Sequence, residues 1–149
     1  MFALAFDRRH KILLARFSGI FNSSDIAELD TEIVRFTSEH GPVHGILDFS
    51  AVTAVSVPLS KLVQRGRQPA ISPTCKRIIV AKGPELFELA RAFTVQQGLA
   101  GTREPLVVAS MEEAIAVLAG PRQRSLQSFT TPTGQATDVR TASTTDKEE

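Results

Sequence analysis

The fold class is indicated by residues 43–66, VHGILDFSAVTAVSVPLSKLVQRG, which pass from a strand into a helix. Val43 to Phe49 is a short apolar run, typical of a strand that is buried on both faces. Pro58 and Gly66 then bracket a short helix, because proline is favoured at the first helical position and glycine just beyond the last. A strand followed by a helix is the repeating unit of parallel sheets.

The residues before this stretch predict a hairpin and a longer helix. Apolar residues alternate with alanine over residues 2–6, as in a half-buried strand, and residues 12–17 form a second strand that ends at Ser18-Gly19. The turn between these strands is so short that they are expected to pair in antiparallel fashion. Residues 22–25 are helix-capping types, and the helix that they start is expected to stop at residues 41–42, Gly-Pro.

The residues after the stretch repeat the strand and helix alternation. We expect strands at 77–81 and 105–109, and helices that begin at Pro84 and just after Ser110. The predicted order is β-β-α-β-α-β-α-β-α. This order is typical of a single α/β domain with a mixed, mostly parallel sheet, an antiparallel hairpin at its start and about four helices.

The overall composition is that of an average globular domain. The 149 residues carry a net charge of +1, with 42% apolar and 22% charged residues. The single cysteine, Cys75, excludes an intrachain disulfide and a zinc site built on cysteines. A highly basic nucleic-acid binder is excluded too, because the charge is nearly balanced and no Tyr or Trp is present for base stacking.

The chain is predicted to divide near residue 120. Residues 1–119 form the expected domain, whereas residues 120–149 are rich in Thr and Ser and poor in large apolar side chains. Such a segment cannot bury enough surface to offset its conformational entropy, so we expect a disordered tail. Leu126 and Phe129 are its only candidates for docking back or for contacting a partner. No apolar run is long enough for an integral membrane segment, and a cytoplasmic location is expected.

A search for catalytic or metal-binding patterns finds no constellation that supports an enzyme or a cofactor. His40 and His44 have the spacing of a helical metal pair, but a Gly-Pro break lies between them. The chain has no nucleophile elbow and no glycine-rich phosphate loop. Lys82 and Gly83 precede a helix N-terminus and are a candidate anion-binding site, although a tight strand-to-helix turn explains them equally well.

Basic residues gather in one part of the chain, because no acidic residue occurs between Asp48 and Glu85. One interpretation is a surface for an acidic protein, a phosphate-bearing ligand or an anionic membrane. The alternative is a solvated surface whose counter-charges come from other segments. The basic residues are Lys61, Arg65, Arg67, Lys76, Arg77 and Lys82.

Residues 46–58, ILDFSAVTAVSVP, resemble the signature of STAS domains, the family of the SpoIIAA-type anti-sigma-factor antagonists and of the cytoplasmic domains of sulfate transporters. In that family a strand ends in Asp-Leu-Ser, and an Asp-Ser-Ser-Gly run opens the next helix. Residues 82–89 and 103–118 also resemble the end of a divergent SpoIIAA-like group of small bacterial proteins. The resemblance covers residues 1–119 and implies a SpoIIAA-like fold.

The resemblance implies a regulatory role, with one departure. In the antagonists, a kinase that doubles as the anti-sigma factor phosphorylates a serine at the helix start. The matching position here is Val57, which has no hydroxyl group, and its neighbours are Ser56, Pro58 and Leu59. The usual switch therefore cannot operate at Val57. Ser56 is either an alternative phosphorylation site or a helix cap.

The leading hypothesis is a non-catalytic protein-interaction module that binds a kinase-like or other signalling protein, with a homodimer left open. The alternative is a carrier of a lipid-like or nucleotide-like anionic small molecule, and an enzyme is a third class. Asp48 and Ser50 match the family pattern, although a turn at the strand end would also use them. The predicted partner-binding surface consists of Asp48, Ser50, Ser56, Val57, Pro58, Lys61 and Arg65.

Overall fold

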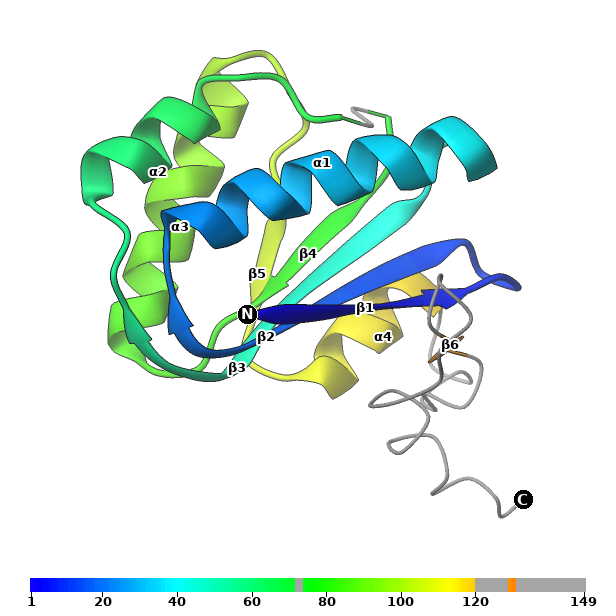
Figure 1. The fold of residues 1–149 in the computed structure, drawn as a ribbon, viewed down its shortest axis with the longest axis horizontal. Helices are drawn as coiled ribbons and strands as arrows, with labels where there is room; N and C mark the ends of the chain where they lie inside the picture. Colours follow the sequence, from blue (N-terminus) through cyan, green and yellow to red (C-terminus); the bar gives the residue numbers. More distant parts are fainter. Residues whose placement is uncertain (72–73, 120–128, 131–149) are drawn as a thin grey trace.

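The computed structural model describes residues 1–71, 74–119 and 129–130. Its elements follow the predicted order (Figure 1), with one short strand added at the end. They are β1 (Phe2–Asp7), β2 (Ile12–Phe21), α1 (Ser23–His40), β3 (His44–Val55), α2 (Leu59–Gly66), β4 (Arg77–Val80), α3 (Pro84–Leu99), β5 (Leu106–Val108), α4 (Met111–Ala119) and β6 (Phe129–Thr130).

The strands form one mixed sheet in the order β5-β4-β3-β2-β1-β6. β1 pairs with β2 in antiparallel fashion, and β3, β4 and β5 continue the sheet in parallel, so the predicted fold class is confirmed. β6 pairs with β1 at the opposite edge. It lies within the segment for which we predict a tail, and the rest of that segment is outside the described residues.

Two strands are longer than the local sequence pattern predicts. β2 continues past Ser18-Gly19 to Phe21, and β3 continues past Phe49 to Val55. The two extensions pair with each other, and the register shifts twice along them. A Ser-Gly pair therefore does not end β2, because Gly19 adopts a φ of +71° at such an irregularity and the chain can continue beside its neighbour.

The sheet separates two apolar layers, because successive residues of a strand point to opposite faces. Helix α4 covers one face, where Ala114 packs with Leu14 and Ile46. Helices α1, α2 and α3 cover the other face (Figure 1), where Leu29 and Leu62 pack with Ala15 and its neighbours. This arrangement places the end of β3 beside the layer that α1, α2 and α3 form.

Local capping residues predict the start of α1 correctly but not that of α2. Asn22 caps α1 and forms a reciprocal capping box with Asp25. Helix α2 begins at Leu59, so the prediction that Pro58 is its first residue is wrong. Pro58 itself occupies the cap position with extended backbone angles and makes no side-chain capping bond. Among the described residues, no helix is long and apolar enough to cross a bilayer.

Candidate functional site

Asp48 and Ser50 lie midway along β3 and form a small polar cluster. The Asp48 side chain is 2% exposed, and its carboxylate accepts hydrogen bonds from the backbone N–H and the hydroxyl of Ser50. The Nε atom of Arg16 lies 3.3 Å from the same carboxylate. Asp48 thus bonds to nearby backbone, but it does so within a strand and not in the turn that was expected at a strand end. The Ser50 residue is exposed beside this cluster.

The start of α2 presents only part of the predicted surface to solvent. Ser56 and Pro58 are exposed, and the backbone N–H of Ser56 donates to the Phe21 carbonyl. Val57 is only 7% exposed and belongs to the apolar cluster around Phe17. Val57 therefore supports the helix start from inside the domain rather than lying on its surface.

Lys61 and Arg65 follow on α2, and they border one recess of about 220 Å³ between α1 and α2. Lys61 is exposed. Arg65 instead turns toward α1, where its Nε and Nη2 atoms lie 2.8 and 3.1 Å from the two carboxylate oxygens of Asp30. The predicted basic pair thus consists of one solvated cation and one cation that is held in an ion pair.

Lys82 and Gly83 are exposed at the start of α3, and they lie apart from the start of α2 along the sheet edge. The register places Val80 opposite Asp48, so the turn at Lys82 is level with Ser50. Ser56 lies six residues farther along, or roughly 20 Å in an extended strand. The structure therefore brings Lys82 toward the Asp48 cluster and separates it from the start of α2.

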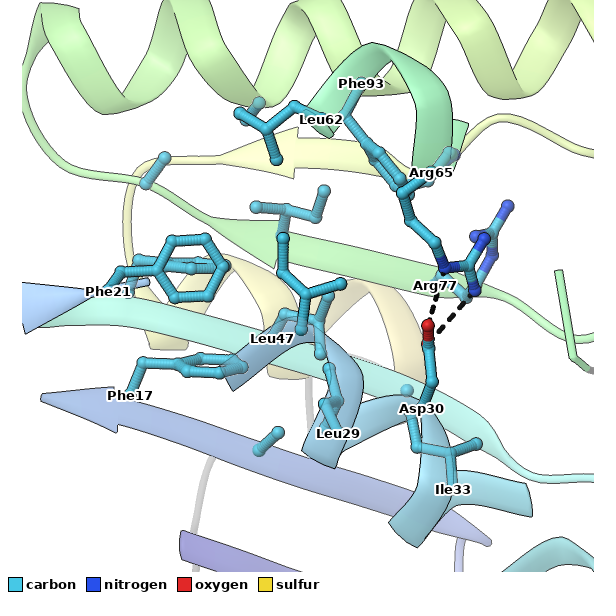
Figure 2. Close-up of a pocket in the computed structure, with 18 of the residues that line it drawn as sticks. Phe17, Phe21, Leu29, Asp30, Ile33, Leu47, Leu62, Arg65, Arg77 and Phe93 are labelled. Atoms are coloured by element: carbon cyan, nitrogen blue, oxygen red, sulfur yellow. Dashed lines mark hydrogen bonds and ion pairs between the residues drawn. The ribbon is translucent and has the colours of Figure 1, made fainter. Parts of the chain in front are cut away.

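A cavity that the sequence does not indicate lies between the sheet and helices α1, α2 and α3. Its volume is about 180 Å³, and its walls are largely apolar. Figure 2 shows Phe17, Phe21 and Leu47 on the sheet side, with Leu29 and Leu62 on the helices. Leu86, Leu89 and Phe93 of α3 also line it and are only half-buried, so the helix layer does not close over the sheet completely.

Among the described residues that line this cavity, the charged ones are Asp30, Arg65 and Arg77. Arg77 stands at the start of β4, and its guanidinium donates to Oε1 of Gln97 at 2.6 Å and to the Arg103 carbonyl at 2.6 Å. Burial, and then the nearby charge of Arg65, lower the pKa of Arg77 to about 10. Arg77 remains a cation at neutral pH.

Gln97 belongs to the candidate site, although the sequence does not indicate it. It is fully buried on α3, and its amide nitrogen donates to the carbonyls of Gly66 and Gln68 at 2.6 Å each. It therefore fixes the end of α2 while it holds Arg77 beside the cavity. No local sequence pattern distinguishes a buried helical glutamine from an exposed one. The sequence therefore carries no signal for this role.

The metal-ligating side chains of the described residues are dispersed. Within residues 1–71, 74–119 and 129–130, no three metal-ligating side chains come together. His40 ends α1 and bonds to the Phe36 carbonyl, whereas His44 begins β3 and accepts from the backbone of Lys76. The two histidines of the helical spacing are therefore in separate elements, as the Gly-Pro break predicts.

Comparison with known proteins gives a match in structure. A solved structure of the anti-sigma factor antagonist SpoIIAA in its unphosphorylated form superimposes with a TM-score of 0.54. The match covers 80% of this chain and 99% of that chain, at 18% sequence identity. The chain has a SpoIIAA-like fold. Neither the comparison with protein-family models nor the comparison with curated protein sequences finds a match.

The SpoIIAA-like fold confirms the resemblance drawn from residues 46–58. In this fold the second parallel crossover, from β3 to β4, contains α2, whose start carries Ser56 and Pro58. At 18% identity the likeness establishes the architecture of the sheet and helices. The chemistry of the site must then be argued from the side chains of this chain.

Proposed function

We propose that this protein is a non-catalytic regulatory module that acts in the cytoplasm by binding another signalling protein. The observation that carries the proposal is the SpoIIAA-like fold, which spans 99% of the chain of an anti-sigma factor antagonist. An antagonist acts through its surface and needs no catalytic group. Fold alone does not determine function, so the surface must supply the rest of the argument.

The exposed start of α2 is the proposed contact surface. Leu59 is 55% exposed there, beside the exposed residues Ser56, Pro58 and Lys61. The cap residue makes no side-chain hydrogen bond to the first turn, so backbone N–H groups at the helix start face outward. An apolar side chain next to a cation and unpaired N–H groups favours a partner with an acidic loop that carries an apolar residue.

Regulation by phosphorylation must use a position other than Val57, because valine has no hydroxyl group. Ser56 is the nearest exposed hydroxyl that precedes the helix, and Ser50 is the exposed hydroxyl beside Asp48. A phosphate on Ser56 would add about two negative charges close to the N-terminus of α2. The same charge would repel an acidic partner, so we propose that modification of Ser56 releases the partner.

Affinity capture from a lysate of the source organism tests this proposal, with mass analysis of both bait and captured protein. The unmodified chain is expected to retain a specific partner, and Lys61→Glu is expected to weaken that complex by about tenfold, because it reverses a charge at the contact. Ser56→Asp should act in the same direction. A mass increase of ~80 Da on the bait would identify phosphorylation.

Arg8→Glu is the matched control, since it reverses an exposed charge in the turn between β1 and β2. It should leave capture unchanged. Equal capture by the unmodified chain, Lys61→Glu and Ser56→Asp would contradict the proposed surface. Failure to capture any protein from lysates of several growth conditions would contradict the interaction module itself.

A further inference from the structure

The cavity behind α1, α2 and α3 has the character of a binding site for an amphiphilic molecule. Its walls come from alternate residues of the sheet, such as Leu47 and Ile79, and from apolar residues of the helices, such as Leu62 and Phe93. Figure 2 shows Leu47, Leu62 and Phe93 around a common space, while the charged side chains of Asp30, Arg65 and Arg77 stand together at one end. An apolar body with a charged head matches this division.

The charged end of the cavity carries an unbalanced positive charge. Arg65 and Arg77 supply two cations, whereas Asp30 supplies one anion, so the group has a net charge of 2 − 1 = +1. Among the described residues, no carboxylate forms an ion pair with Arg77. The Nη1 atom of Arg65 is buried and has no hydrogen-bond partner within the described part of the chain.

A buried donor without a partner is costly, and a desolvated cation is more so. The guanidinium groups of Arg65 and Arg77 lie next to each other (Figure 2), and the charge of Arg65 lowers the pKa of Arg77. Gln97 and the Arg103 carbonyl nevertheless hold Arg77 in place with two short hydrogen bonds. The site is therefore organised in advance to receive one negative charge.

We propose that this cavity binds a monocarboxylate with a linear or compact apolar chain, its carboxylate on Arg65 and Arg77. A monoanion balances the net charge of +1, whereas a phosphate monoester would bring about two negative charges. Cavity size sets the chain length: an apolar cavity of ~150 Å³ holds benzene, so this one takes an apolar body of about seven carbons. Longer chains would have to extend through the opening of the cavity.

The outer recess gives the site a route to solvent. Ile26, Asp30 and Arg65 line both the apolar cavity and the recess between α1 and α2. The ion pair of Asp30 and Arg65 therefore stands between the two spaces. The exposed cation Lys61 borders the recess and would attract a carboxylate toward it.

Calorimetric titration of the full chain with sodium octanoate tests the proposal, because octanoate carries a seven-carbon tail. Octanoate is expected to bind with one-to-one stoichiometry. We expect 1-octanol, which lacks the charge, and acetate, which lacks the chain, to bind at least about tenfold more weakly. Octyl phosphate separates the two anionic heads, and it should bind more weakly than octanoate.

Two variants test the two halves of the site. Arg77→Met removes a cation and should weaken octanoate binding by about tenfold or more, with little effect on 1-octanol. Ala90→Phe fills the apolar end from α3 and should abolish the binding of both ligands. Arg91→Met, on an exposed part of the same helix, is the control and should change neither.

Several results would overturn the inference. They are a failure of octanoate to bind the unmodified chain, equal binding of octanoate and 1-octanol, tighter binding of octyl phosphate, and full binding by folded Ala90→Phe. Circular dichroism establishes that each variant is folded before titration. The inference does not rest on the proposed protein partner, since Ser56→Asp at the α2 start and Ala90→Phe in the cavity report on the two sites separately.

Discussion

Asp30 of α1 and Arg65 of α2 are joined by two roughly parallel hydrogen bonds, 2.8 and 3.1 Å long, across 35 residues of sequence. The Arg65 side chain is 18% exposed and that of Asp30 is 35% exposed, so water screens the pair in part. This ion pair links the first two helices of the layer. It fixes the spacing at the mouth of the cavity.

We predict that Asp30→Asn lowers the free energy of unfolding by about 1–2 kcal/mol, because it leaves the partly buried Arg65 without its carboxylate. Urea denaturation measures the change. A double-mutant cycle with Arg65→Met isolates the pair from other effects of each substitution, and a coupling energy near 1 kcal/mol is expected. Strictly additive effects of the two substitutions would show that the bond does not stabilise the fold.

Gln97 is expected to be the most sensitive polar residue of α3. Gln97→Leu leaves the carbonyls of Gly66 and Gln68 without a donor and removes the acceptor of Arg77. Each unsatisfied buried group costs about 1–3 kcal/mol, so the free energy of unfolding should fall by about 2–4 kcal/mol in total. Chemical denaturation followed by circular dichroism measures the loss.

Gln96→Leu is the matched control for Gln97→Leu, because the hydrogen bond that the Gln96 side chain accepts from Arg67 is long, at 3.4 Å, and exposed. It should change the free energy of unfolding by no more than about 0.5 kcal/mol. If the two substitutions destabilised the protein equally, helix propensity rather than the buried network would explain the effect.

Gly66 marks the closest approach of α2 and α3. A Cβ atom at this position would lie 2.6 Å from the Gln96 Cβ and 3.2 Å from the Phe93 carbonyl. We predict that Gly66→Ala lowers the free energy of unfolding by about 1–3 kcal/mol, because the two helices must separate to relieve the clash. This loss exceeds the gain in helix propensity of about 0.5–1 kcal/mol. Thermal and urea unfolding measure the difference.

Gly98→Ala provides a comparison within α3. Its Cβ would approach the carboxylate of Glu104, at 2.5 Å, but that side chain is flexible and can rotate away. We therefore expect Gly98→Ala to be neutral or slightly stabilising. A large loss of stability in this variant and none in Gly66→Ala would contradict the proposed contact between α2 and α3.

Local chemistry made much of the fold predictable. Residues 22–25 start α1 as expected, and Asn22 and Asp25 form reciprocal bonds there. At α4, Ser110 accepts from the backbone of Glu113 as expected, although the Glu113 carboxylate bonds to Ala109 rather than back to Ser110. Such capping signals act within a few residues, so they can be found in the sequence alone.

The candidate site depends on contacts between residues that are far apart in the sequence, and no local sequence pattern predicts such contacts. Arg65 reads as an exposed cation in sequence, and its pairing with Asp30 appears only when α1 and α2 are placed on the same face. Val57 is predicted to lie on the partner-binding surface, but the long pairing of β2 with β3 brings it into the apolar cluster around Phe17. The cavity likewise forms only when α1, α2 and α3 are placed over the sheet.

His44 links the stability of the fold to pH. Its Nδ1 atom accepts a hydrogen bond of 3.0 Å from the backbone N–H of Lys76. Burial, then the charges of Lys76 and Arg103, lower the pKa of His44 below its ordinary value of 6.5. The folded chain therefore takes up this proton at a lower pH than the unfolded chain. Between those two pKa values the unfolded state binds more protons, so stability rises with pH.

The contribution of His44 is thus complete above about pH 6.5 and is lost as the pH falls through the lowered pKa of the folded state. We predict that the free energy of unfolding, measured in urea from pH 7.5 to pH 5, declines in the unmodified chain. His44→Gln cannot titrate and should show a flatter decline over the same range. His10 and His40 are present in both proteins, so the difference between the two curves reports on His44. Parallel curves would show that protonation of His44 does not oppose folding.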